Sequence, residues 1–354
     1  MSTFSNNSGK IGLDPFRQLL LPYRGKVRKE VVKGPAFGVD TAVIDLGNNL
    51  GLAVSSDPLS LIPSLGLRES AWLSVQLLVN DMATTGFPPQ YAQFVLNLSP
   101  DTTRDQFSEY WKYIHQFCEE AGVAITGGHT GQVPGQNSTI PGGGTMFLKA
   151  PLDQIITSDG AEPGDVIVVT KETALNSTAI LAMSFPDTVK KNLGHEIYNI
   201  ACDNFYRTSS LPDALEAVKV LKQKEEIKAM HDVTEGGVLG AISEMAEASG
   251  CGFRVEDHKI PSSVAPRRIA QLFKFDHRLS VGAGSMIMAV KPGSEQRLIR
   301  HLQNHSIPAT AVGRMTEPAA GRKIVENGEV KGFDFDGVDP YWNAYYRALS
   351  SGWT

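Results

Sequence analysis

The sequence predicts a two-domain protein of the α+β class. At 354 residues the chain is longer than a single hydrophobic core usually grows, so two domains are expected. Short apolar runs of strand length alternate with longer runs at helical spacing along most of the chain. A polar stretch at residues 153–164, which contains Gly160 and Pro163-Gly164, separates two such series. We therefore expect an arm at residues 1–35, domains at 36–155 and 156–340, and a tail at 341–354.

Charge and composition narrow the classes of partner. The formal net charge of -5 provides no basic surface, which argues against nucleic acid or an anionic membrane as the main partner. No segment approaches the roughly 18 uncharged apolar residues that a membrane span requires, so a cytoplasmic protein is expected. Cys118, Cys202 and Cys251 are too far apart for a CxxC metal site, and we interpret them as small buried hydrophobes.

The first domain is expected to begin with a hairpin. The apolar runs 42–46 and 51–56 are joined by Gly47-Asn48-Asn49, which is typical of a tight turn. After the hairpin, apolar spacing predicts helices at 69–85 and 103–121 and strands at 91–98, 123–126 and 145–150, with one short helix near 15–21 in the arm. The loop 141–144, with Gly142 to Gly144, precedes the last of these strands.

The second domain is expected to form an α/β sandwich, because strands and helices alternate throughout it. The predicted strands are 165–170, 227–230, 252–255, 285–290 and 310–313. Helices are predicted up to residue 222 and at 238–250, 265–273 and 294–304. From Arg322 onward the pattern indicates a short hairpin and then a loose end.

The stretch from Met230 to Gly237 predicts a strand, a glycine turn and a helix. The free N–H groups and the positive dipole of a helix start together attract anions. Asp232 and Thr234 stand at the mouth of this turn, where a carboxylate could hold a metal ion that binds phosphate. The alternative interpretation is a plain N-cap with a tight loop.

Four aspartates lie at the ends of predicted elements: Asp40, Asp57, Asp81 and Asp232. A carboxylate in the last turn of a helix, as at Asp81, is unfavourable unless a cation compensates it, although a solvated carboxylate is an equal alternative. Hard oxygen ligands beside glycine turns are typical of Mg²⁺ with a nucleoside triphosphate. Spacing alone does not show that the four converge. Walker A, Gly-x-Ser-x-Gly and His-Glu-x-x-His motifs do not occur.

Five motifs, taken in order, resemble the signature series of one superfamily. They are Gly38-Val39-Asp40-Thr41-Ala42-Val43, Ser56-Asp57-Pro58, Val79-Asn80-Asp81-Met82-Ala83, Thr126-Gly127-Gly128-His129-Thr130 and Asp232-Val233-Thr234-Glu235-Gly236-Gly237. The superfamily contains aminoimidazole ribonucleotide (AIR) synthase, thiamine-monophosphate kinase, selenophosphate synthetase and the hydrogenase maturation protein HypE. The likeness covers roughly residues 9–315 and is strongest to HypE-like, AIR synthase-related proteins, whose arm resembles Ser8-Gly9-Lys10-Ile11-Gly12.

This resemblance implies a two-domain AIR synthase-like fold, with an N-terminal α+β domain that forms a dimeric β-barrel and a C-terminal α/β sandwich. It implies ATP and Mg²⁺ as cofactors where the domains and the partner subunit meet. The implied metal ligands are Asp40, Asp57, Asp81 and Asp232. The implied cofactor-binding residues are Lys10, Asn80, Gly127, Gly128, Thr130, Thr234, Gly236 and Gly237, and the implied catalytic residues are Asp232 and His129.

Three features depart from the family pattern. Val39 and Thr41 flank Asp40, where family members often carry two adjacent acids. His129 stands where thiamine-monophosphate kinase and HypE have aspartate, and since histidine is a poor Mg²⁺ ligand we expect it to contact phosphate or carry a proton. No cysteine follows Cys251, whereas HypE ends in the cysteine that carries the carbamoyl group, and the arm has no cysteine of the selenophosphate synthetase kind.

The expected function is therefore ATP- and Mg²⁺-dependent phosphorylation or activation of an oxygen on a small acceptor or on a partner protein's modified side chain. The alternatives are a nucleotide-binding accessory protein without turnover, and a small-molecule kinase like thiamine-monophosphate kinase. A homodimer is also expected, because the apolar strands within 42–56, 91–98 and 145–150 need more cover than one domain supplies.

Overall fold

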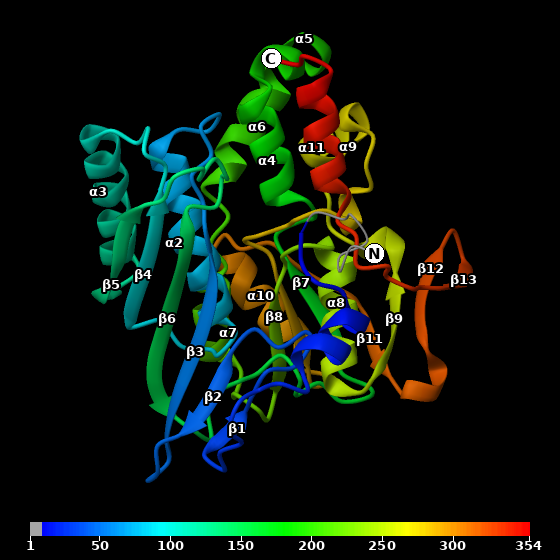
Figure 1. Cartoon of the computed structure of the whole chain (residues 1–354). Helices are drawn as coiled ribbons and strands as arrows, with labels where there is room; N and C mark the ends of the chain where they lie inside the picture. The colour runs from blue at the N-terminus through cyan, green and yellow to red at the C-terminus, as the bar shows by residue number, and fades with distance from the viewer. Residues whose placement is uncertain (1–8) are drawn as a thin grey trace.

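The computed structural model describes residues 9–354, so the first eight residues of the predicted arm lie outside the described part of the chain. Two β-sheets with separate helical layers lie side by side (Figure 1). The fold is the two-domain α+β architecture that the sequence predicts. In the arm, the described residues contain a short helical segment, with α1 at Leu13–Pro15 and the π-helical turn η1 at Phe16–Leu20.

The first sheet has six strands in the order β1-β2-β3-β6-β4-β5. All neighbours are antiparallel except β4 and β5, which run parallel. The strands are β1 (Val31–Lys33), β2 (Ala42–Asp45), β3 (Leu50–Leu59), β4 (Tyr91–Leu98), β5 (Ala124–Gln132) and β6 (Gly142–Pro151). Helices α2 (Leu67–Ala83) and α3 (Arg104–Glu120) pack against one face of this sheet.

The predicted hairpin is confirmed as β2 and β3. Leu50 donates its backbone N–H to the carbonyl of Gly47 at 3.0 Å, and Asn48 and Asn49 both have positive φ, of 53° and 58°. Two left-handed residues make the turn whose twist matches paired strands, and asparagine tolerates that conformation well. Ala42 lies opposite Val54, so Asp40 and Asp57 reach the same end of the hairpin.

Two glycine runs of this domain differ from their predictions, which place a loop at 141–144 and end the strand at 123–126 before Gly127. Gly127 to Gly131 continue strand β5, and Gly142 to Gly144 begin strand β6. The physical reason is close backbone packing: a Cβ on Gly128 would lie 1.8 Å from the carbonyl oxygen of Phe94. These glycines therefore permit close strand pairing, which local composition did not distinguish from a turn.

The second sheet has seven strands in the order β13-β12-β9-β11-β7-β10-β8. They are β7 (Val166–Thr170), β8 (Ile227–Asp232), β9 (Gly252–Glu256), β10 (Met286–Val290), β11 (Ala309–Thr316), β12 (Arg322–Glu326) and β13 (Glu329–Gly332). Each predicted strand of this domain is present, and the hairpin predicted after Arg322 is β12 with β13.

Helices cover both faces of the second sheet, as expected of a sandwich. Alternate residues of β7 point to opposite sides: Ile167 and Val169 pack with α8 (Gly237–Ser249), whereas Val166 and Val168 pack with α7 (Leu211–Val220) and α10 (Glu295–Asn304). Every residue of β7 is buried, because both faces of the strand are covered. The 3₁₀ turns are η2 (Asp257–Lys259), η3 (His277–Leu279) and η4 (Pro318–Ala320).

A separate helical cluster stands above the second sheet in Figure 1. It contains α4 (Leu175–Ser184), α5 (Pro186–Leu193), α6 (His195–Phe205), α9 (Val264–Phe273) and α11 (Pro340–Ser350). The prediction of a loose end was wrong, because residues 340–350 form α11. The Asp339 side chain accepts a hydrogen bond from Tyr341 N at 2.8 Å and caps this helix, and Tyr341 and Ala344 are buried.

The chain beyond α11 is also held in place. Trp353 packs edge-on against Phe273 with ring centroids 4.9 Å apart, and it contacts Phe185 at 6.5 Å. Thr188 donates its N–H to the carbonyl of Thr354 at 2.7 Å. These contacts are long-range and aromatic, so the helical or strand period of the sequence does not reveal them.

Replacing Trp353 by alanine is expected to lower the free energy of unfolding by about 2 kcal/mol, the scale of burying one large apolar side chain. Urea unfolding of the two proteins measures the difference. Leu349→Ala, at a side chain that is 56% exposed near the end of α11, is the matched control and should change stability by less than about 0.5 kcal/mol. Equal losses in both variants would contradict the packing role of Trp353.

The prediction of three buried cysteines is confirmed in part. Cys118 and Cys251 are buried, whereas Cys202 is only partly buried, and all three are free thiols. Among the helices of residues 9–354, none combines the length and the apolar character needed to cross a membrane.

Candidate functional site

Four elements from both domains bring the predicted aspartates together. Asp40 precedes β2, Asp57 lies within β3, Asp81 lies in the last turn of α2, and Asp232 ends β8. Oxygen atoms of Asp40 and Asp232 and a ring nitrogen of His231 all lie within 4.8 Å of one another. The charges of Asp232, Asp57 and Asp40 also act on Asp81, so the four carboxyl groups lie within electrostatic range of one another. Among residues 9–354, the group at metal-ligand spacing contains Asp40 and Asp232 but neither Asp57 nor Asp81.

Hydroxyl groups hold two of these carboxylates. Ser158 donates to Asp40 Oδ2 at 2.9 Å, and Ser55 donates to Asp81 Oδ2 at 2.5 Å. Asp232 differs from both, because it is 1% exposed and neither carboxylate oxygen has a hydrogen-bond partner among residues 9–354. A buried carboxylate without a partner is costly, which indicates that a cation belongs beside it.

Burial and mutual repulsion oppose ionisation of all four acids. Burial raises the pKa of Asp57 to about 6, and Glu235 adds to the rise. The pKa values of Asp81 and Asp232 are raised well above the ordinary range by burial and by the neighbouring aspartates. Burial also raises the pKa of Asp40, despite the opposing charges of His231 and Lys10. A divalent cation would reverse these shifts, because it favours the ionised form of each ligand.

A buried charge network adjoins the aspartates. Lys10 Nζ lies 2.7 Å from Glu244 Oε2, and His231 Nε2 lies 3.3 Å from the same oxygen and 3.5 Å from Asp40 Oδ1. Burial opposes the charge on His231, but Asp40 and Glu244 outweigh it and raise the pKa to about 9. Burial likewise opposes the charge on Glu244, but Lys10 and His231 lower its pKa to about 2.

The sequence analysis identified Lys10 but missed Glu244 and His231. Glu244 lies in the middle of α8, where Val238 to Ala246 are all buried. An acid on the apolar face of a helix is unusual unless it is paired, and that local signal could have singled it out. The sequence around His231 carries no comparable signal. Two of its acidic neighbours in space are Asp40, from the first domain, and Glu244, from α8.

The strand, turn and helix predicted around Asp232 are present, but two of their amides have partners. Gly236 N donates to Asp339 Oδ2 at 2.8 Å, and Gly237 N donates to the carbonyl of Thr234 at 3.1 Å. Glu235 accepts hydrogen bonds from the Trp342 indole, at 3.0 Å, and from the backbone of Lys10. The arm and α11 thus shape this turn, and in this structure these two N–H groups are not free to bind an anion.

Asn80 lies beside the cluster, and both polar atoms of its amide make hydrogen bonds to the second domain. Its nitrogen donates to the carbonyl of Thr208 at 2.9 Å, and its oxygen accepts from Ser210 N at 2.7 Å. It is fully buried. In this structure Asn80 therefore joins the first domain to the second, and it holds the helix turn that carries Asp81.

The structure does not bring the Gly127 to Thr130 motif to the aspartates of the same chain. Asp57, Gly144, Phe94 and Gly128 lie opposite one another across β3, β6, β4 and β5. Three strand spacings of about 4.8 Å put Gly128 roughly 14 Å from Asp57 along the sheet. Side chains alternate between faces, so His129 and Asp57 point to opposite sides of the sheet. The motif is solvent-exposed on the edge strand.

The donor set fits Mg²⁺. Mg²⁺ prefers carboxylate oxygens and retains several waters, and this region offers four carboxylates, of which Asp232 has both oxygens unpartnered. The network holds five carboxylates, counting Glu244, against the two cations Lys10 and His231. The surplus of buried negative charge requires protons or metal cations.

Comparison with known proteins gives consistent results. The family model described as AIR synthase related protein, N-terminal domain, matches residues 38–147, and the corresponding C-terminal domain model matches residues 162–326. Selenide, water dikinase of Methanococcus maripaludis is 29% identical over 326 residues, which cover 87% of this chain and 93% of that protein. Carbamoyl dehydratase HypE of Escherichia coli is 22% identical over 269 residues, which cover 74% of each chain.

Solved structures agree on the fold. A crystal structure of hydrogenase maturation protein HypE in complex with ATP matches with a TM-score of 0.68 and 18% identity, covering 94% of this chain and 97% of that one. At this identity the likeness shows the shared architecture of the two domains.

Proposed function

This chain belongs to the AIR synthase related family, and from that premise we propose that it is an ATP- and Mg²⁺-dependent enzyme that phosphorylates or otherwise activates an oxygen of an acceptor. The observation that carries the proposal is the buried, unpartnered Asp232 carboxylate within a cluster of four aspartates. Relatives named as a dikinase and a dehydratase, and a structural relative that binds ATP, support the same class.

The chain's own residues have separable roles in this proposal. Asp40, Asp57, Asp81 and Asp232 would hold Mg²⁺, which offsets phosphate charge in phosphoryl transfer. Ser158 and Ser55 orient two of these carboxylates through hydrogen bonds. Glu244 keeps His231 protonated and holds the Lys10 ammonium beside the cluster. Positioning and charge stabilisation are nearly all that phosphoryl transfer requires of a protein.

Calorimetry with ATP and Mg²⁺, followed by a phosphate-release assay, tests the proposal. Binding with acceptor-dependent release supports an enzyme of this type. Binding without release under any acceptor supports a nucleotide-binding accessory protein instead. If the protein does not bind ATP, both the enzymatic and the accessory function are excluded. A screen of small acceptors and of proteins with modified side chains then identifies the acceptor.

We also propose a homodimer through the uncovered face of the first sheet. Tyr91 and Phe147 stack there with ring centroids 5.3 Å apart, and Val95, four residues further along β4 on the same face, is 43% exposed. His129 lies opposite Val95 on β5, so the same face carries the glycine motif. A second copy on this face would bury the apolar side chains and place a partner subunit next to His129.

Sedimentation velocity at micromolar concentration is expected to show a dimer for the native protein and a monomer for Val95→Asp, because a charge on this face disfavours its burial. Val264→Asp, at a residue 54% exposed on α9, is the matched control and should remain dimeric. A native protein that sediments only as a monomer would contradict the proposal.

A further inference from the structure

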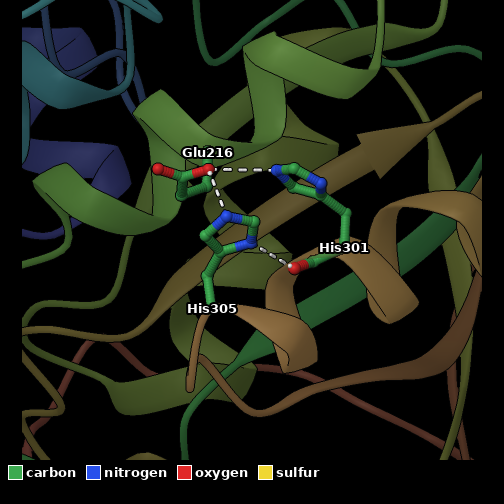
Figure 2. A group of neighbouring side chains, drawn as sticks. All are labelled: Glu216, His301 and His305. Atoms are coloured by element: carbon green, nitrogen blue, oxygen red, sulfur yellow. Dashed lines mark hydrogen bonds and ion pairs between the residues drawn. The ribbon is translucent and has the colours of Figure 1, made fainter.

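A cluster of two histidines and one glutamate lies outside the candidate site, on the helices that cover the other face of the second sheet. Glu216 projects from α7, and His301 and His305 lie four residues apart at the end of α10 (Figure 2). Residues four apart share one face of a helix, and the two imidazole centroids are 4.4 Å apart. All three side chains retain some exposure, so ions in solution can reach them.

The three ligand atoms have the spacing of a metal site. His301 Nε2 lies 3.0 Å and His305 Nε2 lies 3.6 Å from Glu216 Oε2, and the three atoms lie within 4.8 Å of one another. A tetrahedral ion with bonds of about 2.0–2.1 Å separates its ligand atoms by about 3.3 Å. The two distances from Glu216 Oε2 to the imidazole nitrogens, 3.0 Å and 3.6 Å, lie on either side of that value. Small side-chain movements would therefore bring the three atoms to tetrahedral metal-ligand spacing.

Outer contacts direct the ligand atoms inward. His305 Nδ1 donates to the carbonyl of His301 at 2.8 Å, which leaves Nε2 as the free ring nitrogen facing Glu216. Metal-binding histidines commonly donate their second ring N–H to a carbonyl in this way. Lys219 donates to Glu216 Oε1, which leaves Oε2 for the two imidazoles. Figure 2 shows both rings turned toward the carboxylate.

We propose that Glu216, His301 and His305 bind one divalent transition-metal ion, of which Zn²⁺ is the representative, with water in the fourth position. Two imidazoles and one carboxylate suit Zn²⁺ and its neighbours, whereas Mg²⁺ selects sites made wholly of oxygen. The bound ion joins α7 to α10 and so stabilises the second domain without taking part in the chemistry of the aspartate cluster.

Zn²⁺ titration by calorimetry, in the presence of millimolar Mg²⁺ to occupy the aspartates, tests this site on the full chain. The native protein is expected to bind one more Zn²⁺ than the His301→Ala/His305→Ala double variant. Glu216→Gln keeps the side-chain size, removes the anionic ligand and should weaken Zn²⁺ binding more than tenfold. Co²⁺ should give the visible absorption of a tetrahedral site in the native protein and not in the double variant.

Two controls separate this site from others. His258→Ala, at an exposed histidine elsewhere in the second domain, should bind Zn²⁺ as the native protein does. The additional Zn²⁺ site should also persist in Asp232→Asn, which alters the aspartate cluster instead. Equal Zn²⁺ stoichiometry and affinity in the native protein, the double variant and Glu216→Gln would overturn the proposal. If circular dichroism shows that the double variant is unfolded, Glu216→Gln alone decides.

Discussion

Replacing Asp232 by asparagine is expected to lower ATP turnover on the order of 100-fold or more, the largest effect on activity that we predict. Asparagine keeps the shape of the side chain but removes one negative charge from a buried carboxylate that accepts no hydrogen bond from the described part of the chain. The loss should appear mainly in kcat, with a higher Mg²⁺ concentration needed for half-maximal rate. Steady-state phosphate release over a Mg²⁺ series measures both quantities.

Asp101→Asn is the matched control, because Asp101 is exposed on the loop before α3 and lies outside the cluster. Its turnover and Mg²⁺ dependence should equal those of the native protein. Should Asp232→Asn retain native turnover and native Mg²⁺ dependence, the assignment of the metal ion to the aspartate cluster would have to be abandoned.

Replacing Glu244 by glutamine is expected to lower the free energy of unfolding by about 3 kcal/mol near pH 6 in metal-free buffer, the largest predicted effect on stability. His231 is 1% exposed and would lose its closest charge partner, which leaves the buried imidazolium only partly compensated, by Asp40 at 3.5 Å. Lys10 contributes less, because its side chain is 42% exposed and solvent screens it. Urea unfolding of the two proteins measures the difference.

The same pair predicts how this difference varies with pH. The folded-state pKa of Glu244 is about 2, below its ordinary 4.5, so its contribution is present above pH 4.5 and is lost as the pH falls toward 2. The folded-state pKa of His231 is about 9, above its ordinary 6.5, so its contribution is complete below pH 6.5 and is lost as the pH rises through 9. The difference in the free energy of unfolding between the native protein and Glu244→Gln should therefore be widest between pH 4.5 and pH 6.5, and it should narrow above pH 9.

Glu225→Gln is the control for this experiment, because Glu225 is 71% exposed and pairs only with exposed Lys222. Such a surface pair contributes little, so its stability should stay within about 0.5 kcal/mol of native at each pH. If the loss of stability caused by Glu244→Gln is the same at pH 6 and above pH 9, charge pairing between Glu244 and His231 does not stabilise the fold.

Local structure was largely predictable from the sequence. Strand 91–98 was located at its observed bounds, and helix 103–121 differs from α3 by one residue at each end. Both have local causes: apolar residues at every second position of the strand, and a capping box in which Thr103 and Gln106 satisfy each other's backbone amides. The hairpin at Gly47 to Asn49 was predictable for the same reason, because a two-residue turn depends on its own residues.

The errors occurred where a distant contact decides the conformation. The glycine runs of β5 and β6 have the composition of turns, but the backbone of β4 packs so closely on Gly128 and Gly142 that only glycine fits at these two positions. Residues 340–350 show a weak pattern, and they form α11 because Phe185, which follows α4, and Phe273 of α9 belong to the cluster that buries one face of the helix, with the Phe185 and Tyr345 ring centroids 5.4 Å apart. Local composition cannot reveal these contacts, because each one joins residues that are far apart in the sequence.

The sequence by itself determined the two-domain α+β class, most helices and strands, the resemblance to the family and the four aspartates, because each depends on residue type and spacing. Only the tertiary structure decided that Asp40 and Asp232 meet at His231, that Glu244 balances Lys10 and His231, and that His129 points away from the aspartates. The physical reason is distance along the chain. Residues nearly two hundred positions apart share one site only through the packing of two domains, which no local pattern records.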